Sequence, residues 1–265
     1  MNKVLRLKTA TLTTALTLSI INFPGNWQYG LAQTPTSTAK VRYVAPVAVE
    51  KPGEPRGRRR GGGSRGPCKQ YETLTALVPI TKTGTKESVW GQSISQNPTF
   101  WFLVSDKLTP KVPVEFVIQD DTDNYVYQTK FNPPETAAGI ISVAVPPTAA
   151  LEVGKSYRWT FSIYCDSDKP SASVYVRGSV TRIALEPKLQ KQLQTAKTPL
   201  ERAAVFAQNG IWYDALTTLG EQMQSSKRED PEIASAWIEL LKQVNLDNSA
   251  SVGIVPCCTP KSQTL

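Results

Sequence analysis

Short apolar runs bounded by turn residues fill the middle of the chain, from Leu74 to Ile183. They are rich in β-branched and aromatic residues, which favour extended strands. In the run Tyr157–Cys165 apolar and polar side chains alternate, as in a strand with one buried face and one wetter face. Eight strands are predicted, over residues 74–79, 89–94, 99–104, 114–119, 125–131, 140–145, 157–165 and 173–183.

No helical pattern interrupts these runs, and this argues against a βαβ sheet. The sequence therefore predicts a mainly β fold, an antiparallel β-sandwich of immunoglobulin-like or jelly-roll-like type, over residues 67–185. Residues 99–104 are apolar at successive positions, so we expect a central strand that is covered on both faces.

After the predicted sandwich the apolar positions change to a helical period. A first stripe begins at Leu189 and leads to a C-terminal stop signal at Gly210. A last helix begins at Asp230 as cap, with Pro231 in its first turn. A small helical hairpin segment is thus predicted over residues 186–247. Its apolar surface exceeds what a hairpin can bury alone, so we expect it to dock on the sandwich.

The first 32 residues have the pattern of a signal peptide. Lys3, Arg6 and Lys8 precede a mildly apolar stretch over residues 10–21, which is shorter than the roughly 20 residues of a transmembrane helix. A small-x-small pattern predicts cleavage after Ala32. We therefore expect an exported protein, periplasmic or extracellular, with no membrane span in the mature chain. The alternative is an uncleaved anchor at a membrane surface.

Two segments have the composition of disordered chain, a Pro/Gly/Arg-rich linker over residues 33–66 and a tail over 248–265. The formal net charge of +8 lies in the leader and the linker. Residues 1–50 carry +4 and residues 51–66 carry +5, which leaves −1 for residues 67–265. The folded part has no overall field that would attract nucleic acid, so we expect no nucleic-acid partner.

Four cysteines fit an oxidising compartment. Cys68 opens the β-rich region and Cys165 lies deep inside it. Neighbouring cysteines rarely bond each other because the ring is strained. We therefore predict a disulfide between Cys68 and Cys165, which leaves Cys257 and Cys258 free or intermolecular. The alternative for the first pair is two unconnected buried thiols.

Five sequence blocks form a series between residues 57 and 246. They are GRRRGGGSRGPC at 57–68, LTALVP at 74–79, PTFWF at 98–102, LEVGKSYRW at 151–159 and NGIWYDAL at 209–216. The series resembles a cyanobacterial family of unknown function, DUF928. The resemblance implies an exported cyanobacterial protein without an assigned activity, and it supplies no catalytic residues.

The arginines of the linker are candidates for anion binding, since guanidinium groups suit phosphate, sulfate or an acidic polysaccharide. They include Arg58, Arg59, Arg60 and Arg65. The alternatives are a solvated linker or a clamp that pins the chain beside the Cys68 disulfide.

Acidic residues gather between two predicted strands. Asp120, Asp121 and Asp123 are candidates for a cation-binding loop, or for a hydrolase pair drawn from them. Their spacing misses the EF-hand pattern, and a solvated hairpin tip is the favoured interpretation.

Tryptophans could line a sugar-binding face, although we favour packing in the core for each of them. They are Trp90, Trp101, Trp159, Trp212 and Trp237.

The chain contains no histidine, which excludes Ser-His-Asp and Cys-His catalysis and His-ligated zinc. No phosphate-binding glycine motif follows a strand and opens a helix. We therefore expect no enzyme, no cofactor and no resident metal. The favoured function is a non-catalytic binding or structural module of the envelope or extracellular space, with a protein or anionic glycan as partner. The alternative is a carboxylate-dependent hydrolase that acts on envelope polysaccharide.

Overall fold

The computed structural model describes residues 40–47, 57–61, 68–83, 86–166, 172–225 and 230–258. Its strands are β1 (Thr75–Ala76), β2 (Ile80–Thr83), β3 (Lys86–Ser93), β4 (Thr99–Val104), β5 (Val114–Gln119), β6 (Tyr125–Phe131), β7 (Gly139–Ala144), β8 (Ser156–Tyr164) and β9 (Ser173–Arg182). Its helices are α1 (Pro187–Thr195), α2 (Pro199–Gln208), α3 (Trp212–Ser225), α4 (Pro231–Lys242) and α5 (Asp247–Ala250). The predicted signal peptide lies outside the described residues. None of the described helices is long and apolar enough to cross a membrane.

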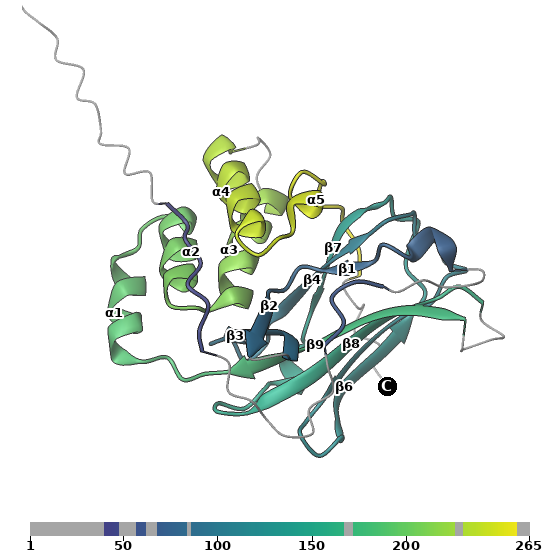
Figure 1. Ribbon diagram of the computed structural model, residues 1–265, viewed down its shortest axis with the longest axis horizontal. Coiled ribbons are helices and arrows are strands. Elements are labelled where there is room, and N and C mark those ends of the chain that lie inside the picture. The colour runs from purple at the N-terminus through teal and green to yellow at the C-terminus, as the bar shows by residue number, and fades with distance from the viewer. Residues whose placement is uncertain are drawn as a thin grey trace, which may run out of the picture. The chain divides into compact units, whose positions relative to one another are not determined.

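The strands form two facing sheets (Figure 1). One has the order β1-β4-β7, and the other has the order β2-β3-β9-β8-β5-β6. Their inner faces meet through aromatic rings: Phe102 of β4 stacks on Phe161 of β8 with ring centroids 4.3 Å apart, and Phe100 lies 5.0 Å from Phe116 of β5. This interdigitation is typical of a β-sandwich, so the predicted fold class is confirmed.

One strand pair departs from the predicted antiparallel arrangement. β3 and β9 run parallel, with Trp90 opposite Ser179. Five strands separate these two along the chain, so no hairpin fixes their relative direction. The sequence also missed β2, which pairs with β3 as an antiparallel edge strand.

The prediction of a disordered linker is wrong for residues 57–61. Arg58 exchanges both main-chain bonds with Arg177 of β9, at 2.7 and 2.9 Å. Gly61 N donates to Leu74 O at 2.7 Å, and Ala76 N donates to Arg59 O at 2.8 Å, beside β1. These residues therefore join an edge of one sheet to the other. The glycines of this segment predicted that no packed element forms here. An extended chain that makes main-chain hydrogen bonds to a strand on each side nevertheless tolerates glycine.

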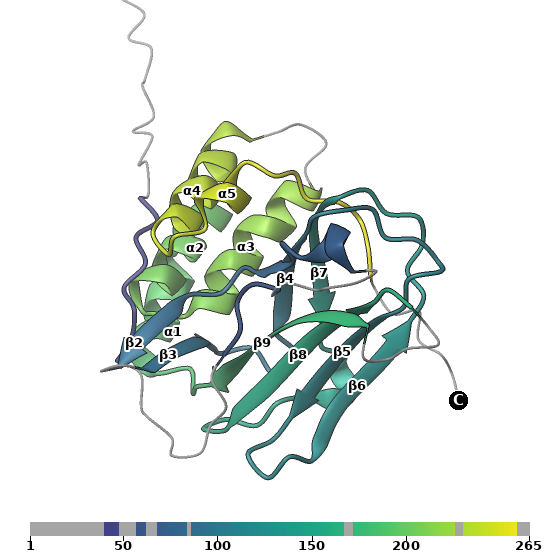
Figure 2. The same ribbon diagram turned by 45° about the vertical axis from the view of Figure 1, so that its right-hand side comes forward.

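The helices cover the outer face of the three-stranded sheet (Figure 2). Trp101 of β4 points away from the sandwich core, contacts the ring of Trp237 and donates through Nε1 to Thr217 Oγ1 at 3.1 Å. Gly220 of α3 faces the Trp101 ring, which leaves no room there for a Cβ atom. β4 is thus covered on both faces, as its apolar pattern predicts.

The first turn of α3 inserts two aromatic residues beside the strands. Trp212 and Tyr213 are 0% and 1% exposed. Trp212 Nε1 donates to Leu77 O at 2.8 Å. The Tyr213 hydroxyl donates to Ser179 O at 3.1 Å and accepts from Trp159 Nε1 at 2.9 Å. Every polar atom of this aromatic insertion has a partner, so its burial carries no unsatisfied group.

The helical segment has one break that the sequence pattern did not predict. The stripe from Leu189 is broken into α1 and α2, because Pro199 starts a new helix. Thr198 and Glu201 form a capping box there, with Glu201 N donating to Thr198 Oγ1 at 3.1 Å. This signal is local and visible in the sequence, since a Thr three residues before a Glu marks a helix start.

The prediction of a disordered tail is wrong for residues 248–258. Ile140 N of β7 donates to Gly253 O at 2.9 Å, and Val255 N donates to Ile140 O at 2.8 Å. The tail therefore extends an edge of the three-stranded sheet. Composition missed it because these bonds use main-chain groups, which any residue except proline offers in full.

Both cysteine pairs are bonded. The predicted disulfide between Cys68 and Cys165 is confirmed, with their Cα atoms 5.3 Å apart. The prediction that Cys257 and Cys258 are unbonded to each other is wrong, because they form a disulfide between neighbours. The backbone accommodates this ring through a left-handed conformation at Cys258, with a φ of 67°.

Replacing Cys68 and Cys165 by serine should lower the free energy of unfolding by about 2–5 kcal/mol in urea titrations. The bond joins residues 97 positions apart, so its loss enlarges the unfolded ensemble. The matched control replaces Cys257 and Cys258, whose bond closes almost no loop, and should change stability by less than about 1 kcal/mol. Equal losses in the two variants would contradict the loop argument.

Tyr213→Phe should lower the free energy of unfolding by about 1–3 kcal/mol. The substitution leaves the Trp159 indole N–H and the Ser179 carbonyl without their hydrogen-bond partner. The control is Tyr43→Phe, since the Tyr43 hydroxyl is buried without a hydrogen-bond partner among the described residues. Thermal and denaturant unfolding should show the control unchanged or more stable. A larger loss for Tyr43→Phe would contradict the hydrogen-bond assignment.

Candidate functional site

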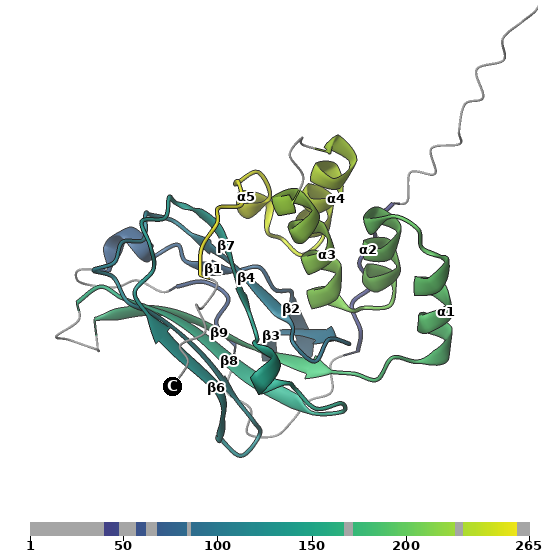
Figure 3. The same cartoon turned by 180° about the vertical axis from the view of Figure 1, so that it is seen from behind.

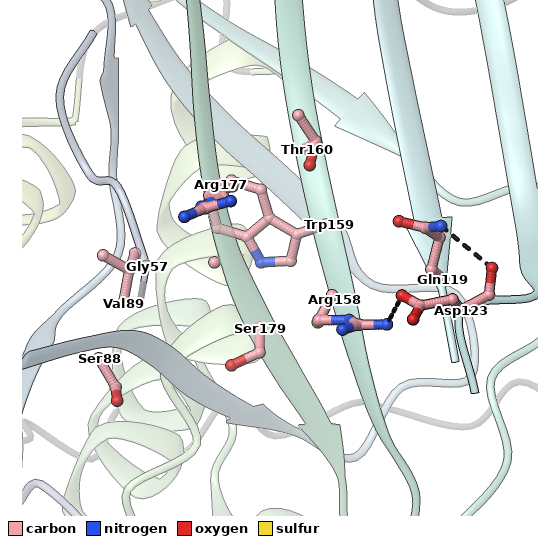
Figure 4. Close-up of a pocket in the computed structure, with 11 residues that line it drawn as sticks. Gly57, Ser88, Val89, Gln119, Asp123, Arg158, Trp159, Thr160, Arg177 and Ser179 are labelled. Carbon is pink, nitrogen blue, oxygen red and sulfur yellow. Dashed lines mark hydrogen bonds and ion pairs between the residues drawn. The ribbon is translucent and has the colours of Figure 1, made fainter. Parts of the chain in front are cut away.

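A hollow of about 130 Å³ lies on the six-stranded sheet, where β9 changes its neighbour (Figure 4). From Ser179 onward β9 pairs with β3, whereas at Arg177 it pairs with Arg58. Main-chain pairing is interrupted between these two neighbours. The polar side chains that line the hollow come from β3, β5, β8, β9 and the turn after β5, and they are Ser88, Gln119, Asp123, Arg158, Thr160, Arg177 and Ser179.

Strand geometry directs these side chains to one face. On β8 the side chains of Trp159 and Phe161 are buried in the sandwich, so Arg158 and Thr160 point to the opposite, outer face. The register between β8 and β9 then places Arg158 opposite Ser179 and Thr160 opposite Arg177. Arg158 and Arg177 therefore occupy diagonal positions on neighbouring strands and line the same hollow.

Arg158 is held in place by the hairpin between β5 and β6. Its guanidinium forms an ion pair with the Asp123 carboxylate and donates to Asp120 O at 3.1 Å. Gln119 Nε2 in turn donates to Asp123 O at 3.1 Å. Arg158 Nε is buried and has no hydrogen-bond partner among the described residues. Arg158 and Arg177 thus both line the hollow, together with the Asp123 carboxylate that pairs with Arg158.

The arginines of the predicted anion cluster do not gather at one point. Arg58 lies over the Tyr175 ring at 4.8 Å, and its Nε donates to Arg60 O at 3.2 Å. Arg59 points to the helices, where it donates to Val244 O at 2.8 Å and to Asn245 O at 3.1 Å. It therefore satisfies carbonyls at the end of α4, as a clamp. Arg65 lies outside the described residues.

The predicted cation loop is the turn between β5 and β6. The Asp120 carboxylate accepts hydrogen bonds from the main chain and side chains of Thr122 and Asn124, at 2.8 to 3.1 Å. These bonds stabilise the charged form and lower the pKa of Asp120 to about 2. Asp121 is exposed, and Asp123 faces Arg158. Within the described stretches no three acidic or cysteine side chains are grouped to hold a metal ion.

Arg158 and Arg177 are functional candidates that sequence reasoning missed. Both occupy polar positions of strands that alternate, which is a visible signal. Their proximity depends on the register between β8 and β9, and this register cannot be read from the sequence. Of the tryptophans, four are core residues, and Trp90 lies partly buried with its Nε1 donating to Thr181 Oγ1 at 2.9 Å.

Asp214 is the carboxyl with the clearest sign of burial. It lies in the first turn of α3, and its Oδ2 accepts from Ile94 N at 3.2 Å. Desolvation raises the pKa of Asp214 to about 6, although a hydrogen bond from Ser93 opposes the shift. Asp214 does not line the hollow. Its role is to tie α3 to the end of β3.

A family model described as Domain of Unknown Function (DUF928) matches residues 60–254. The match begins in the segment that joins the two sheets and ends in the strand-like tail. A search of curated proteins finds no match.

Asp214→Asn should remove a pH dependence of stability. The folded pKa of about 6 exceeds the unfolded value of about 3.9, so the folded state binds the extra proton between them. Stability from this group is complete below pH 4 and is lost as the pH rises through 6. Between pH 4 and pH 7 the free energy of unfolding of the unmodified chain should fall by about 3 kcal/mol relative to that of the variant. A difference that does not change with pH would contradict the assignment.

Proposed function

The chain belongs to the DUF928 family, and we propose that it is a non-catalytic binding module whose ligand is an acidic glycan. The observation that carries this proposal is that Arg158 and Arg177 line one hollow on the outer face of a sheet. Guanidinium groups bind carboxylate and sulfate through paired hydrogen bonds, and both anions occur on acidic polysaccharides.

The remaining polar residues of the hollow suit sugar hydroxyls. Gln119, Thr160 and Ser179 offer amide and hydroxyl groups, which both donate and accept hydrogen bonds. Among the described residues no helix covers this face, so a long chain can cross it (Figure 3). The Tyr175 ring with Arg58 above it extends the same face beyond the hollow. A charged sheet face that no described helix covers supports binding to a polymer.

The carboxylates support a binding role over hydrolysis. Glycosidases use two carboxyl groups, roughly 5–9.5 Å apart, on either side of the scissile bond. Asp123 is the only acid among the described residues that line the hollow, and it is paired with Arg158. The Asp120 carboxylate accepts hydrogen bonds from Thr122 and Asn124 within the hairpin turn. No described second carboxylate faces Asp123 across the hollow.

We place this function outside the cytoplasm. The N-terminal pattern of residues 1–32 predicts export, and both described disulfides suit an oxidising compartment. Acidic polysaccharides are abundant on cell surfaces, whereas nucleic acid is not a partner that this setting favours. The location and the ligand are therefore consistent with each other.

Arg177→Gln should weaken binding to a polyuronate such as alginate by about tenfold, because it removes a charged hydrogen-bond donor from the hollow. Arg158→Gln should act in the same direction. Affinity electrophoresis and calorimetry measure the effect, and added salt should weaken binding further. The matched control is Arg202→Gln, which removes an exposed arginine of α2.

Neutral dextran separates charge recognition from general sugar binding. Binding to alginate or dextran sulfate with none to dextran supports the proposal. Equal binding to dextran, or an equal loss in Arg202→Gln, would contradict it. Release of reducing ends from alginate would overturn the non-catalytic assignment.

A further inference from the structure

Residues 40–47 lie along the helices as an extended segment, drawn in purple in Figure 1. The segment contacts three helical elements: Val44 N donates to Ala207 O of α2 at 3.0 Å, Tyr43 packs on Trp212 of α3, and Gln243 follows α4. The helices therefore hold an extended chain along their surface, and the helix residues that contact it, among them Ala207, Trp212 and Gln243, are called the groove below. The predicted linker is wrong for these residues as well.

Gln243 recognises the main chain of this segment. Its Oε1 accepts from Tyr43 N at 2.8 Å, and its Nε2 donates to Val41 O at 3.0 Å. One amide thus pairs with the carbonyl and N–H that an extended peptide presents two residues apart. Such recognition requires an extended backbone and does not depend on which side chains the peptide carries.

Side chains add selectivity at alternate positions. Val41 is 4% exposed and Tyr43 is partly buried, whereas Arg42 and Val44 face solvent. The Tyr43 ring meets the Trp212 ring edge-on, with centroids 5.0 Å apart. An occupant therefore needs an aliphatic side chain and, two residues later, an aromatic one.

The segment is an imperfect occupant of the groove. The Tyr43 hydroxyl is buried without a hydrogen-bond partner among the described residues, which costs the segment part of its affinity. A phenylalanine at the same position has no hydroxyl to leave unpaired. Gly210 permits the close approach, since a Cβ atom there would lie 3.0 Å from Val44 O and from Pro46 Cδ.

We propose that the groove between α2, α3 and α4 binds an extended peptide segment of a partner protein, with an aliphatic residue followed two positions later by phenylalanine. Residues 40–47 occupy the groove until that peptide displaces them. Nine residues, 48–56, connect the segment to Gly57, so the tethered occupant competes at an effective concentration of about millimolar. A partner peptide displaces residues 40–47 because its phenylalanine fits the position of Tyr43 better than tyrosine does.

The test uses the full chain with its own segment weakened by Val41→Ala and Tyr43→Ala. A fluorescent peptide with the sequence of residues 40–47 should bind this variant in anisotropy titrations, and should bind the unmodified chain at least about tenfold more weakly. Replacing tyrosine by phenylalanine in the peptide should tighten binding about fivefold. Adding Gln243→Ala to the weakened chain should weaken binding about tenfold.

Gln190→Ala, at an exposed glutamine of α1, is the matched control and should leave binding unchanged. Should the weakened chain fail to fold, a protease site placed within residues 48–56 of the unmodified chain frees the segment by cleavage, and the phenylalanine peptide should then displace it. The proposal is overturned if the peptide does not bind a weakened chain that is folded. It is also overturned if the peptide binds the unmodified chain as tightly as the weakened one. Exchange of residues 40–47 between copies, seen as a dimer in size-exclusion chromatography, would also overturn it in favour of self-assembly.

Discussion

The aromatic insertion at the first turn of α3 is the contact on which the rest of the structure depends. Trp212 and Tyr213 bury large side chains, and each carries a polar atom that must find a partner. Those partners are the carbonyl of Leu77, just after β1, and the carbonyl of Ser179 in β9. One helical turn therefore fixes the helices to both sheets at once. Any shift of α3 would leave buried polar atoms unpaired on three elements.

The same insertion supports the hollow from behind. The Ser179 carbonyl accepts a hydrogen bond from the Tyr213 hydroxyl, and Ser179 also lines the hollow. Gly178 lies beside the Trp159 ring, where a Cβ atom would come within 2.5 Å, so any other residue would force the ring or the strand to move. Gly57 completes the wall from the other side, and its neighbour Arg58 pairs with Arg177. The site is thus placed by rigid strands and by a segment that composition describes as a linker.

The two surfaces proposed to bind ligands rely on different forces. The hollow offers charge on a solvated face, where recognition weakens with salt and tolerates a long, repeating ligand. The helical groove offers the side-chain amide of Gln243, which pairs with main-chain groups, and an apolar contact at Trp212; both suit a short extended peptide and depend little on salt. They also lie on different elements, with Arg177 on β9 and the groove on helices α2 to α4.

The sequence by itself determined the elements whose signals are local. The strands over residues 99–104 and 114–119 have the predicted bounds, because short runs of apolar, aromatic and β-branched side chains favour a strand within one segment. Tertiary structure alone decided what depends on pairing between distant segments. The role of Arg58 arises from main-chain bonds to β9, which composition does not encode. Arg158 and Arg177 line one hollow because of the register between two strands, and register is set by the packing of their buried faces, which no single strand specifies.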